Sequence, residues 1–469
     1  MLVLPVLFFC LNTFAQLITY KAPAGVALNN DFAVRVREKG KAWQPLAVYL
    51  AKVAGTAKLT GQMNIENTSF AYFDFAGNVE VAVTFLKGKV NKARVRPFAA
   101  GQVKVTSNTI SFLLTEPRNL SVEVNGDIFH NLQLFANPLE TVHPSASDKN
   151  VLYFGPGIHK VDTVTLRSNQ TVYIAGGAVV QGSFKAYRVR NVKIMGHGII
   201  DHPVRSIEIG YSRNVSVDGV IILNPKHYSA TIGQSDKVSI RNLKSFSCEG
   251  WGDGIDIFCS SNVLIDGVFM RNSDDCIAIY GHRFNWYGNT KNITVQNATL
   301  WADIAHPILI GTHGDPPHPD TLGNMKFSNI DILEHRERQI DYQGCMALNA
   351  GDNNLISDIR FEDIRVDDFS KGQVVNMRVM FNHKYNTAAG MGIRNIYLKN
   401  ISYTGTRANM GVITGYDEAH LIKNITFEHL SINGKVISDR MPGKPNFYKT
   451  GDMANIFIGE HVEGLTFIP

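Results

Sequence analysis

Short runs of alternating apolar and polar residues dominate the first third of the chain. Examples are Phe32–Arg37, Val79–Phe85 and Leu120–Val124, the last of which precedes Asn125-Gly126. Period-two alternation puts every second side chain on one face of a strand, and Asn-Gly is a strong turn signal. Many short strands of this kind predict a β-sandwich over residues 17–140. The Pro- and Ser-containing residues 141–150 then have the composition of a linker.

A different pattern begins at Val151 and continues to Pro469. A motif of the form Asn-Val-x-Ile, with conservative variants, returns every 23 to 37 residues. Its copies begin at Asn191, Asn214, Lys237, Asn262, Asn292, Asn324, Asp358, Asn395 and Asn424. Repeats of this length, with several short β runs and no helical periodicity, predict a β-solenoid whose coils bury their apolar residues against one another. Several of these Asn residues match Asn-x-Ser/Thr, which we attribute to turn geometry rather than to glycosylation.

Three short apolar runs in the middle of the solenoid share one pattern. They are Ile255–Ile257, Ile277–Ile279 and Ile308–Ile310, with successive runs 22 and 31 residues apart. Asp253, Asp275 and His306 each stand two residues before such a run. If the runs are strands of successive coils, these side chains stack about 4.8 Å apart, with Asp274 beside them. Acids crowded in this way are costly to bury and are typical of catalytic sites.

Such a cluster could hydrolyse a glycosidic bond with inversion. One protonated carboxyl donates to the leaving oxygen, while an ionised carboxylate roughly 6.5–9.5 Å away activates a water on the other face of the sugar. Crowding of like charges raises the pKa of one acid and keeps it protonated near neutral pH. His306 could bond to the acid or hold substrate.

Further residues near this column are candidates for substrate binding. The coils lengthen after Asp274-Asp275, and extra residues in a solenoid form loops, often on the binding face. We therefore expect two loops, Tyr280–Gly288 and Thr312–Leu322, to form the walls of a cleft. The candidate substrate-binding residues are His306, His282, Arg283, His227, Tyr228 and Asp256. Asp256 should face away from the core, as a subsite residue or a solvated side chain, and Trp286 and Trp301 could be sugar platforms or packing residues.

These motifs resemble those of family 28 of the glycoside hydrolases, which cleave pectin, and of family 49, the dextranases and isopullulanases. Family 28 carries Asn-Thr-Asp-Gly, an Asp-Asp pair some 21 residues on, and then Gly-His-Gly. The corresponding segments here are Gly252-Asp253-Gly254, Asp274-Asp275 and Ala305-His306-Pro307, with the 21-residue interval kept. The resemblance implies an all-β protein with an N-terminal β-sandwich, as in family 49, followed by a right-handed parallel β-helix over residues 151–469. It also implies Asp274 as general acid and Asp253 with Asp275 as the pair that activates water.

Two departures from the family 28 pattern leave the sugar open. Ala305 and Pro307 replace the glycines beside the histidine. Gly344–Asn353 stands where that family has an Arg-Ile-Lys that holds a uronate carboxylate. A neutral or differently charged α-linked glycan is therefore as plausible a substrate as galacturonate. The His- and Arg-rich loops could hold an acidic or sulfated sugar in another geometry.

Composition and charge narrow the class of protein further. The chain is 44% hydrophobic and 19% charged, which suits a folded protein and argues against disorder. A net charge of +5 without a run of Lys or Arg does not indicate nucleic acid as a partner. The five cysteines have no paired spacing, so we expect buried thiols, no disulfide framework, and neither metal nor cofactor.

The first residues of the chain indicate where the protein is located. Met1–Gln16 is an apolar run too short to span a bilayer and ends in the small residues that a signal peptidase reads. It predicts a signal peptide and export to the periplasm or the exterior, and no later segment could cross a membrane. We therefore expect a secreted glycoside hydrolase that cleaves α-linked bonds in a polysaccharide or oligosaccharide. The alternatives are a polysaccharide lyase, against which the absence of Lys and Arg from the column counts, and a non-catalytic glycan-binding solenoid.

Overall fold

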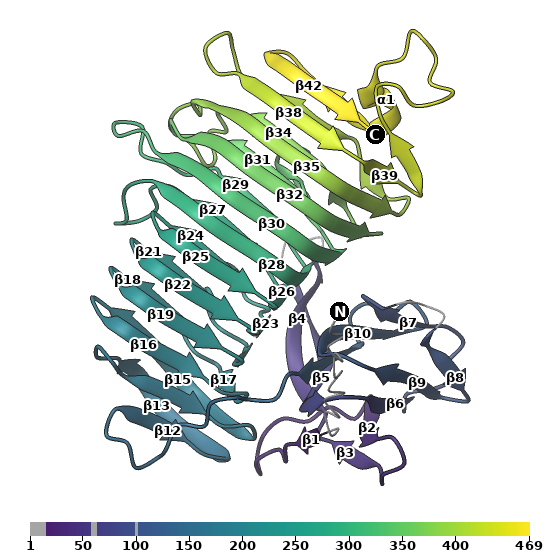
Figure 1. The fold of residues 1–469 in the computed structure, drawn as a ribbon, viewed down its shortest axis with the longest axis vertical. Coiled ribbons are helices and arrows are strands. Elements are labelled where there is room, and N and C mark those ends of the chain that lie inside the picture. Colours follow the sequence, from purple (N-terminus) through teal and green to yellow (C-terminus); the bar gives the residue numbers. More distant parts are fainter. Residues whose placement is uncertain (1–15, 58–62, 99–101) are drawn as a thin grey trace, which may run out of the picture. The chain divides into compact units, whose positions relative to one another are not determined.

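The computed structural model describes residues 16–57, 63–98 and 102–469 (Figure 1). The predicted signal peptide lies outside these residues, apart from Gln16, and stays a prediction. The chain divides into two compact units. One comprises residues up to 22 with 26–50 and 68–143, and the other comprises residues 23–25, 51–67 and 144–469. The second unit thus includes a segment from within the N-terminal region, which no sequence signal indicated.

The N-terminal strands form the two sheets of the expected β-sandwich. One sheet has the order β1-β5-β11-β10-β7, with β4 paired to β5, and the other has the order β3-β2-β6-β9-β8. The strands are β1 (Gln16–Thr19), β2 (Phe32–Glu38), β3 (Gln44–Leu46), β4 (Tyr49–Ala57), β5 (Met63–Ala76), β6 (Val79–Phe85), β7 (Ala93–Arg96), β8 (Lys104–Thr106), β9 (Thr109–Leu114), β10 (Arg118–Val124) and β11 (Leu132–Asn137). Alternate residues of β2 are buried, as its period-two pattern predicts. Asn125 and Gly126 both have positive φ, but β11 begins only at Leu132, so their turn opens a longer loop.

The rest of the chain is a right-handed parallel β-helix, as predicted. Its 29 strands pair in parallel from coil to coil, apart from the antiparallel pair β39–β40, and stack in chain order in Figure 1. β12 begins at Val151, the residue at which the sequence predicts the β-helix to begin.

Each coil contributes strands to three faces. The strands of the first face from β16 to β38 carry the nine copies of the repeat motif. This face comprises β12 (Val151–Phe154), β14 (Thr171–Ile174), β16 (Arg190–Met195), β19 (Arg213–Asp218), β22 (Asp236–Arg241), β25 (Ser261–Asp266), β28 (Thr290–Ala302), β30 (Thr321–Glu334), β32 (Leu355–Asp367), β35 (Gly392–Thr404), β38 (Ile422–Glu428) and β42 (Val462–Ile468). The second comprises β17 (Ile199–Asp201), β20 (Ile221–Leu223), β23 (Lys244–Phe246), β26 (Phe269–Asn272), β39 (Leu430–Ile432) and β40 (Lys435–Ile437), with the later halves of the long strands of the first face.

The third face holds the apolar runs that follow the candidate site residues. Its strands are β13 (Gly157–Thr165), β15 (Ala178–Tyr187), β18 (Ile207–Gly210), β21 (Ala230–Gly233), β24 (Ile255–Phe258), β27 (Ile277–Tyr280), β29 (Ile308–Gly311), β31 (Met346–Ala350), β34 (Val375–Val379), β37 (Gly411–Thr414) and β41 (Ile456–Ile458). The remaining elements are the short pair β33 (Gly372–Gln373) and β36 (Ala408–Asn409), the 3-10 turn η2 (Ile340–Tyr342) and the helix α1 (Thr450–Ala454). Among the described residues, no helix is both long and apolar enough to cross a membrane.

The repeat motif marks a left-handed turn before each strand of the first face. All nine of its first residues have positive φ, between 53° and 60°. Asn tolerates this conformation better than most residues, and its side chain can also bond to a neighbour. The Nδ2 of Asn292 donates to the Oδ1 of Asn262 at 3.0 Å, and the Nδ2 of Asn324 donates to the Oδ1 of Asn292 at 2.7 Å. A ladder of side-chain amides therefore parallels the backbone ladder.

The inward-facing residues of all three faces form one continuous apolar core. Ile, Val and Leu dominate it, and successive residues on one strand alternate between this core and the outside. Cys248, Cys259, Cys276 and Cys345 are buried and free, so the expectation of unpaired thiols is confirmed for the described residues.

We expect that Asn292→Ala will destabilise the protein more than Asn292→Gly, by about 1 kcal/mol, because alanine is strained at positive φ and glycine is not. Both variants lose the two amide hydrogen bonds, so their difference isolates the backbone term. Denaturant midpoints measure it. At the adjacent exposed Lys291 the order should reverse, since glycine there only weakens a strand. Equal midpoints for the two Asn292 variants would contradict this explanation.

Candidate active site

Backbone hydrogen bonds place Asp253, Asp275 and His306 at equivalent positions on three successive coils. Ile255 pairs with Ile277, and Ile277 with Ile308, in the predicted register. The ladder continues into the turns before these strands, where the Gly254 amide donates to the Asp275 carbonyl at 2.8 Å. The Cys276 amide likewise donates to the His306 carbonyl at 2.8 Å. The three side chains therefore form the column that the spacing predicts.

Four carboxyl groups gather at this column, and we call Asp253, Asp256, Asp274 and Asp275 the acid cluster. One carboxylate oxygen of each of Asp253, Asp274 and Asp275 lies within 4.8 Å of one oxygen of the other two. Asp274 is half-buried, whereas the other three are buried.

Asp256 points away from the core, as its place between two core isoleucines predicts, yet it is not solvated. Its side chain is 0% exposed, and neither carboxylate oxygen has a hydrogen-bond partner. The reason is an aromatic cover over this face, which the alternation of residues along the strand does not reveal. Its buried members are Tyr228, Phe258, Tyr280 and Tyr342, with Trp286 and Tyr385 packed against them.

Burial and like charges raise the pKa values of three members of the acid cluster. For Asp274, burial and then the charge of Asp275 raise the pKa to about 7. The pKa values of Asp253 and Asp256 are raised well above the usual range by burial and then by neighbouring acids. The half-buried Asp274 is therefore an acid that can hold its proton near neutral pH.

His306 holds Asp275 from inside the protein. Its Nδ1 lies 2.7 Å from Oδ1 of Asp275, and its backbone amide donates to the same oxygen at 3.0 Å. Burial by itself lowers the pKa of the imidazole, but the charge and hydrogen bond of Asp275 outweigh it and raise the pKa to about 9. A protonated ring donates from both nitrogens, and Nε2 meets the carbonyl oxygen of Tyr342. His306 is 0% exposed, and its carboxylate partner is Asp275 rather than Asp274.

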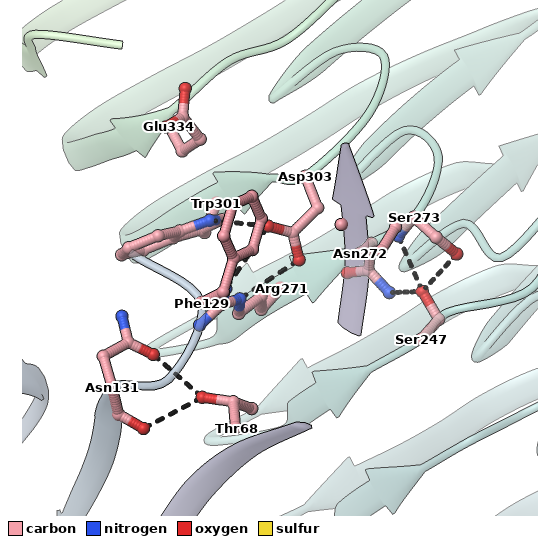
Figure 2. A network of polar contacts seen from close by, with 12 residues as sticks. Thr68, Phe129, Asn131, Ser247, Arg271, Asn272, Ser273, Trp301, Asp303 and Glu334 are labelled. Atoms are coloured by element: carbon pink, nitrogen blue, oxygen red, sulfur yellow. Dashed lines mark hydrogen bonds and ion pairs between the residues drawn. The ribbon is translucent and has the colours of Figure 1, made fainter. Parts of the chain in front are cut away.

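A buried network of hydrogen bonds connects the turns that contain Asp253 and Asp274 (Figure 2). Ser247 Oγ accepts from the backbone amide and the hydroxyl of Ser273, at 2.9 and 3.1 Å, and donates to the carbonyl of Gly252. Asn272 Nδ2 donates to Ser247 Oγ at 3.0 Å and to the Gly252 carbonyl at 3.2 Å. The residues just before Asp253 and Asp274 are thus tied to each other, which limits how far the two carboxyls can move apart.

One of the two candidate sugar platforms belongs to the interior. Trp301 is 0% exposed; its Nε1 donates to Asp303 at 2.9 Å, and Asp303 pairs with the buried Arg271 (Figure 2). The hypothesis that Trp301 is a sugar platform is therefore wrong, because its ring is fully buried, with its centroid 4.4 Å from the guanidinium carbon of Arg271. Trp286 instead lies outside the sheet, stacked on Phe258 with ring centroids 5.2 Å apart.

The predicted substrate-binding residues lie at different distances from the acids. Tyr228 adjoins the acid cluster, since burial and then the charges of Asp256 and Asp253 raise its pKa. The charge of Arg283 acts on Asp256 and Tyr228. Burial and then the charge of Arg205 lower the pKa of His227 to about 4. Its ring lies beside that of Trp251, which is 68% exposed, with ring centroids 6.0 Å apart. His282 instead contacts its own loop, because its Nδ1 lies 2.8 Å from the carbonyl oxygen of Trp286.

Three residues near the acids were not among the sequence candidates. Tyr280 donates its hydroxyl to Oδ2 of Asp275 at 3.3 Å. Its register with Phe258 could have revealed it. Tyr342 and the buried Glu337, whose charge acts on Asp274 and His306, come from the long connection between β30 and β31. No periodicity marks residues in such a connection.

The coil after His306 lacks the cations of the family 28 pattern. β31 presents Ala347 and Asn349 there, and Arg378 lies one coil further, in register with Asn349. Arg378 Nη1 donates to the carbonyl of Asp341 at 3.0 Å. The oxygens of Asp253, Asp274 and Asp275 are close enough to coordinate one cation, but a cation would have to displace the protons that the raised pKa values of Asp253 and Asp274 favour.

Comparison with known proteins points to one family. The model of the family described as glycosyl hydrolases family 28 matches residues 157–444. A probable endopolygalacturonase D of Neosartorya fischeri is 22% identical over 253 residues, which are 53% of this chain and 46% of that protein. A polygalacturonase of Chamaecyparis obtusa is 24% identical over 244 residues, 50% of this chain and 44% of that protein. The chain thus spans less than half the length of these relatives.

A solved structure shares the whole fold. Dex49A from Penicillium minioluteum superimposes with a TM-score of 0.67, covering 96% of each chain at 13% sequence identity. The likeness therefore extends over the N-terminal sheets as well as the β-helix, and at this identity it supports the fold alone.

Asp256→Asn should stabilise the protein at pH 8 by about 1–3 kcal/mol, because it removes a buried, unpaired carboxylate. The folded-state pKa of Asp256 is raised, so its destabilising effect appears as pH rises above the unfolded value and is absent below about pH 4. Melting temperatures at pH 4 and pH 8 measure the change. The exposed Asp162→Asn should give no such pH-dependent gain, and a gain at pH 4 equal to that at pH 8 would contradict the assignment.

Proposed function

The chain belongs to glycosyl hydrolases family 28, and from this premise we propose that it is an inverting glycoside hydrolase that cleaves α-linked bonds in a polysaccharide. The observation that supports this most is the pairing of two unlike acids on adjoining residues. Asp274 is half-buried with its pKa raised to about 7, while the neighbouring Asp275 is ion-paired with His306. Environments that separate two carboxyl groups in this way assign one as acid and one as base.

We assign Asp274 as the general acid and Asp275 as the carboxylate that activates water, assisted by Asp253. Protonated His306 and the Tyr280 hydroxyl together hold both oxygens of Asp275, which fixes the orientation of this carboxylate. His306 acts through Asp275 and does not reach the substrate. Asp253 Oδ1 is buried without a partner, so it can accept a hydrogen bond from the attacking water.

Retention is the competing stereochemical course, in which one carboxylate attacks the sugar directly. Asp275 is poorly suited to such attack, since its oxygens already accept hydrogen bonds from His306 and Tyr280. Asp253 would be the nucleophile of that alternative, once it has lost the proton that its raised pKa favours.

The polymer substrate is proposed from the relatives and from the residues around the acids. Two relatives are named as polygalacturonases, which suggests an α-linked acidic polymer. The Arg-Ile-Lys position is occupied by Ala347 and Asn349, so a uronate at the cleavage point would have to be held by other cations, such as Arg283, whose charge acts on Asp256. An α-linked neutral unit at that point fits these residues equally well.

We expect Asp274→Asn to reduce kcat at least about 10²-fold, because an amide cannot donate the proton that the leaving oxygen needs. The wild-type rate should fall about tenfold per pH unit above about pH 7, as Asp274 loses its proton. Release of reducing ends from polygalacturonate and dextran, with circular dichroism to confirm folding, measures both. Asp162→Asn is the matched control and should retain activity. A fully active Asp274→Asn refutes the assignment, whereas unsaturated products or loss of activity with a chelator would indicate a lyase.

The first-formed reducing sugar should have the β configuration, opposite to that of the cleaved α bond. Proton NMR of the anomeric signals during the first minutes of hydrolysis distinguishes the two anomers before they equilibrate. An α product would instead support the double displacement through Asp253.

A further inference from the structure

A pocket of about 310 Å³ lies on the third face of the β-helix, on coils that precede the acid cluster. We call it the remote pocket, and its charged and aromatic lining consists of Lys185, Tyr187, Arg205, Glu208, Tyr211, Phe284 and Trp286. A volume of this size is at the lower end of those that hold small ligands. Of these residues, the sequence evidence had indicated only Trp286, as a possible sugar platform.

The remote pocket lies in line with the acid cluster. Lys185 pairs with Glu208, Glu208 with Thr231, and Thr231 with Asp256, so one outward-facing column joins them. Three steps of about 4.8 Å separate Lys185 from Asp256. A sugar unit advances a polysaccharide by about one such step, so a chain bound over the acids could extend into the pocket a few units away.

Two glycines on this face are needed to form the pocket. A Cβ at Gly210 would lie 2.7 Å from the ring of Tyr187, and a Cβ at Gly233 would lie 2.2 Å from the ring of Trp286. Only a residue without a side chain lets each ring lie against the sheet. The aromatic walls are thus built into the coils, and they present ring faces of the kind that stack on sugars.

The charge of the pocket is opposite to that of the acid cluster. Lys185 and Arg205 face a single acid, Glu208, whose Oε1 lies 3.2 Å from Nη1 of Arg205. A third cation, Arg188, lies at the rim, 5.7 Å from the ring centroid of Tyr187 and 5.4 Å from that of Tyr211. The cations therefore exceed the acids, which favours an anionic ligand.

The remote pocket and the acid cluster share their walls. Arg205 lies 5.9 Å from the ring centroid of Tyr228, the residue whose pKa Asp253 and Asp256 raise. Trp286, which lines the pocket, stacks on Phe258 at the end of the strand that carries Asp256. A bound chain would therefore contact both sites along one continuous surface.

We propose that the remote pocket is a glycan subsite that binds a negatively charged sugar unit, carboxylated or sulfated, of the same chain whose bond is cleaved at the acid cluster. The proposal rests on the proposed hydrolase function. Lys185 and Arg205 supply charge-assisted hydrogen bonds to the anionic group, and Tyr187 and Trp286 supply the stacking faces. The positive pocket and the negative cluster together would also fix the direction in which an acidic chain lies.

The test measures binding in the Asp274→Asn background, so that it does not depend on turnover. Calorimetry gives Kd for a galacturonate heptamer, a sulfated κ-carrageenan octamer and a neutral isomaltoheptaose. At least one anionic oligomer should bind more tightly than the neutral one and lose affinity with added salt. The double change Lys185→Gln with Arg205→Gln should weaken that binding roughly tenfold or more, since two charged contacts are lost.

The matched control changes the exposed Arg190 and Lys193, on another face, to Gln. It should leave Kd unchanged, and a galacturonate dimer, too short to span both sites, should show little effect of either double variant. Glu208→Gln keeps an acceptor for Arg205 and should tighten anionic binding. The preference between the carboxylated and the sulfated oligomer identifies the anionic group.

The proposal is overturned if neither anionic oligomer binds better than the neutral one, or if the control pair weakens binding as much as the pocket pair. It is also overturned if Glu208→Gln leaves anionic binding unchanged. These outcomes differ from failure of the proposed hydrolase, which would show as full activity of Asp274→Asn while anionic binding in the pocket persists.

Discussion

The backbone hydrogen-bond register between coils is the constraint on which this molecule depends. It puts Asp253, Asp275 and His306 at one position of three successive coils although 22 and 31 residues separate them in sequence. Because successive side chains of a strand point to opposite faces, a slip of one residue would exchange Asp256 for a core isoleucine. The apolar core therefore selects the register, and the register assembles the acids. Ser247 and Asn272 reinforce it by tying the turns of adjoining coils together.

The acid cluster opposes the stability of the fold that builds it. Carboxyl groups under an aromatic cover lose hydration, and their mutual repulsion adds to that loss, which is why three of their pKa values rise. The structure offsets part of this cost locally: His306 supplies a buried positive charge to Asp275. For Asp256 the charge of Arg283 offsets only part of the cost, since its pKa remains raised. An unfavourable local arrangement that the surrounding coils nonetheless hold in place is typical of a functional site.

Periodicity made much of the architecture predictable, and its absence explains what was missed. The Asn motif recurs because each coil must turn through a left-handed residue, so counting copies located the coils. Register then located the column of Asp253, Asp275 and His306. Tyr342 and Glu337 come from an irregular connection in which no repeat exists to count. The burial of Asp256 depends on an aromatic cover drawn partly from distant loops, and the enclosure of Trp301 depends on its partner Asp303. Neither can be obtained from alternation along a single strand.

The lengthening of one coil provides a loop that borders both the acid cluster and the remote pocket. The step between repeat motifs grows from 25 residues to 30 between Asn262 and Asn292, and the connection from β27 to β28 carries His282, Arg283 and Trp286. The charge of Arg283 acts on Asp256, while the ring of Trp286 lies over Gly233 and lines the remote pocket. One loop thus borders the negative cluster on one side and the positive pocket on the other. A change in this loop would alter cleavage and chain binding together, because the two sites have no independent wall between them.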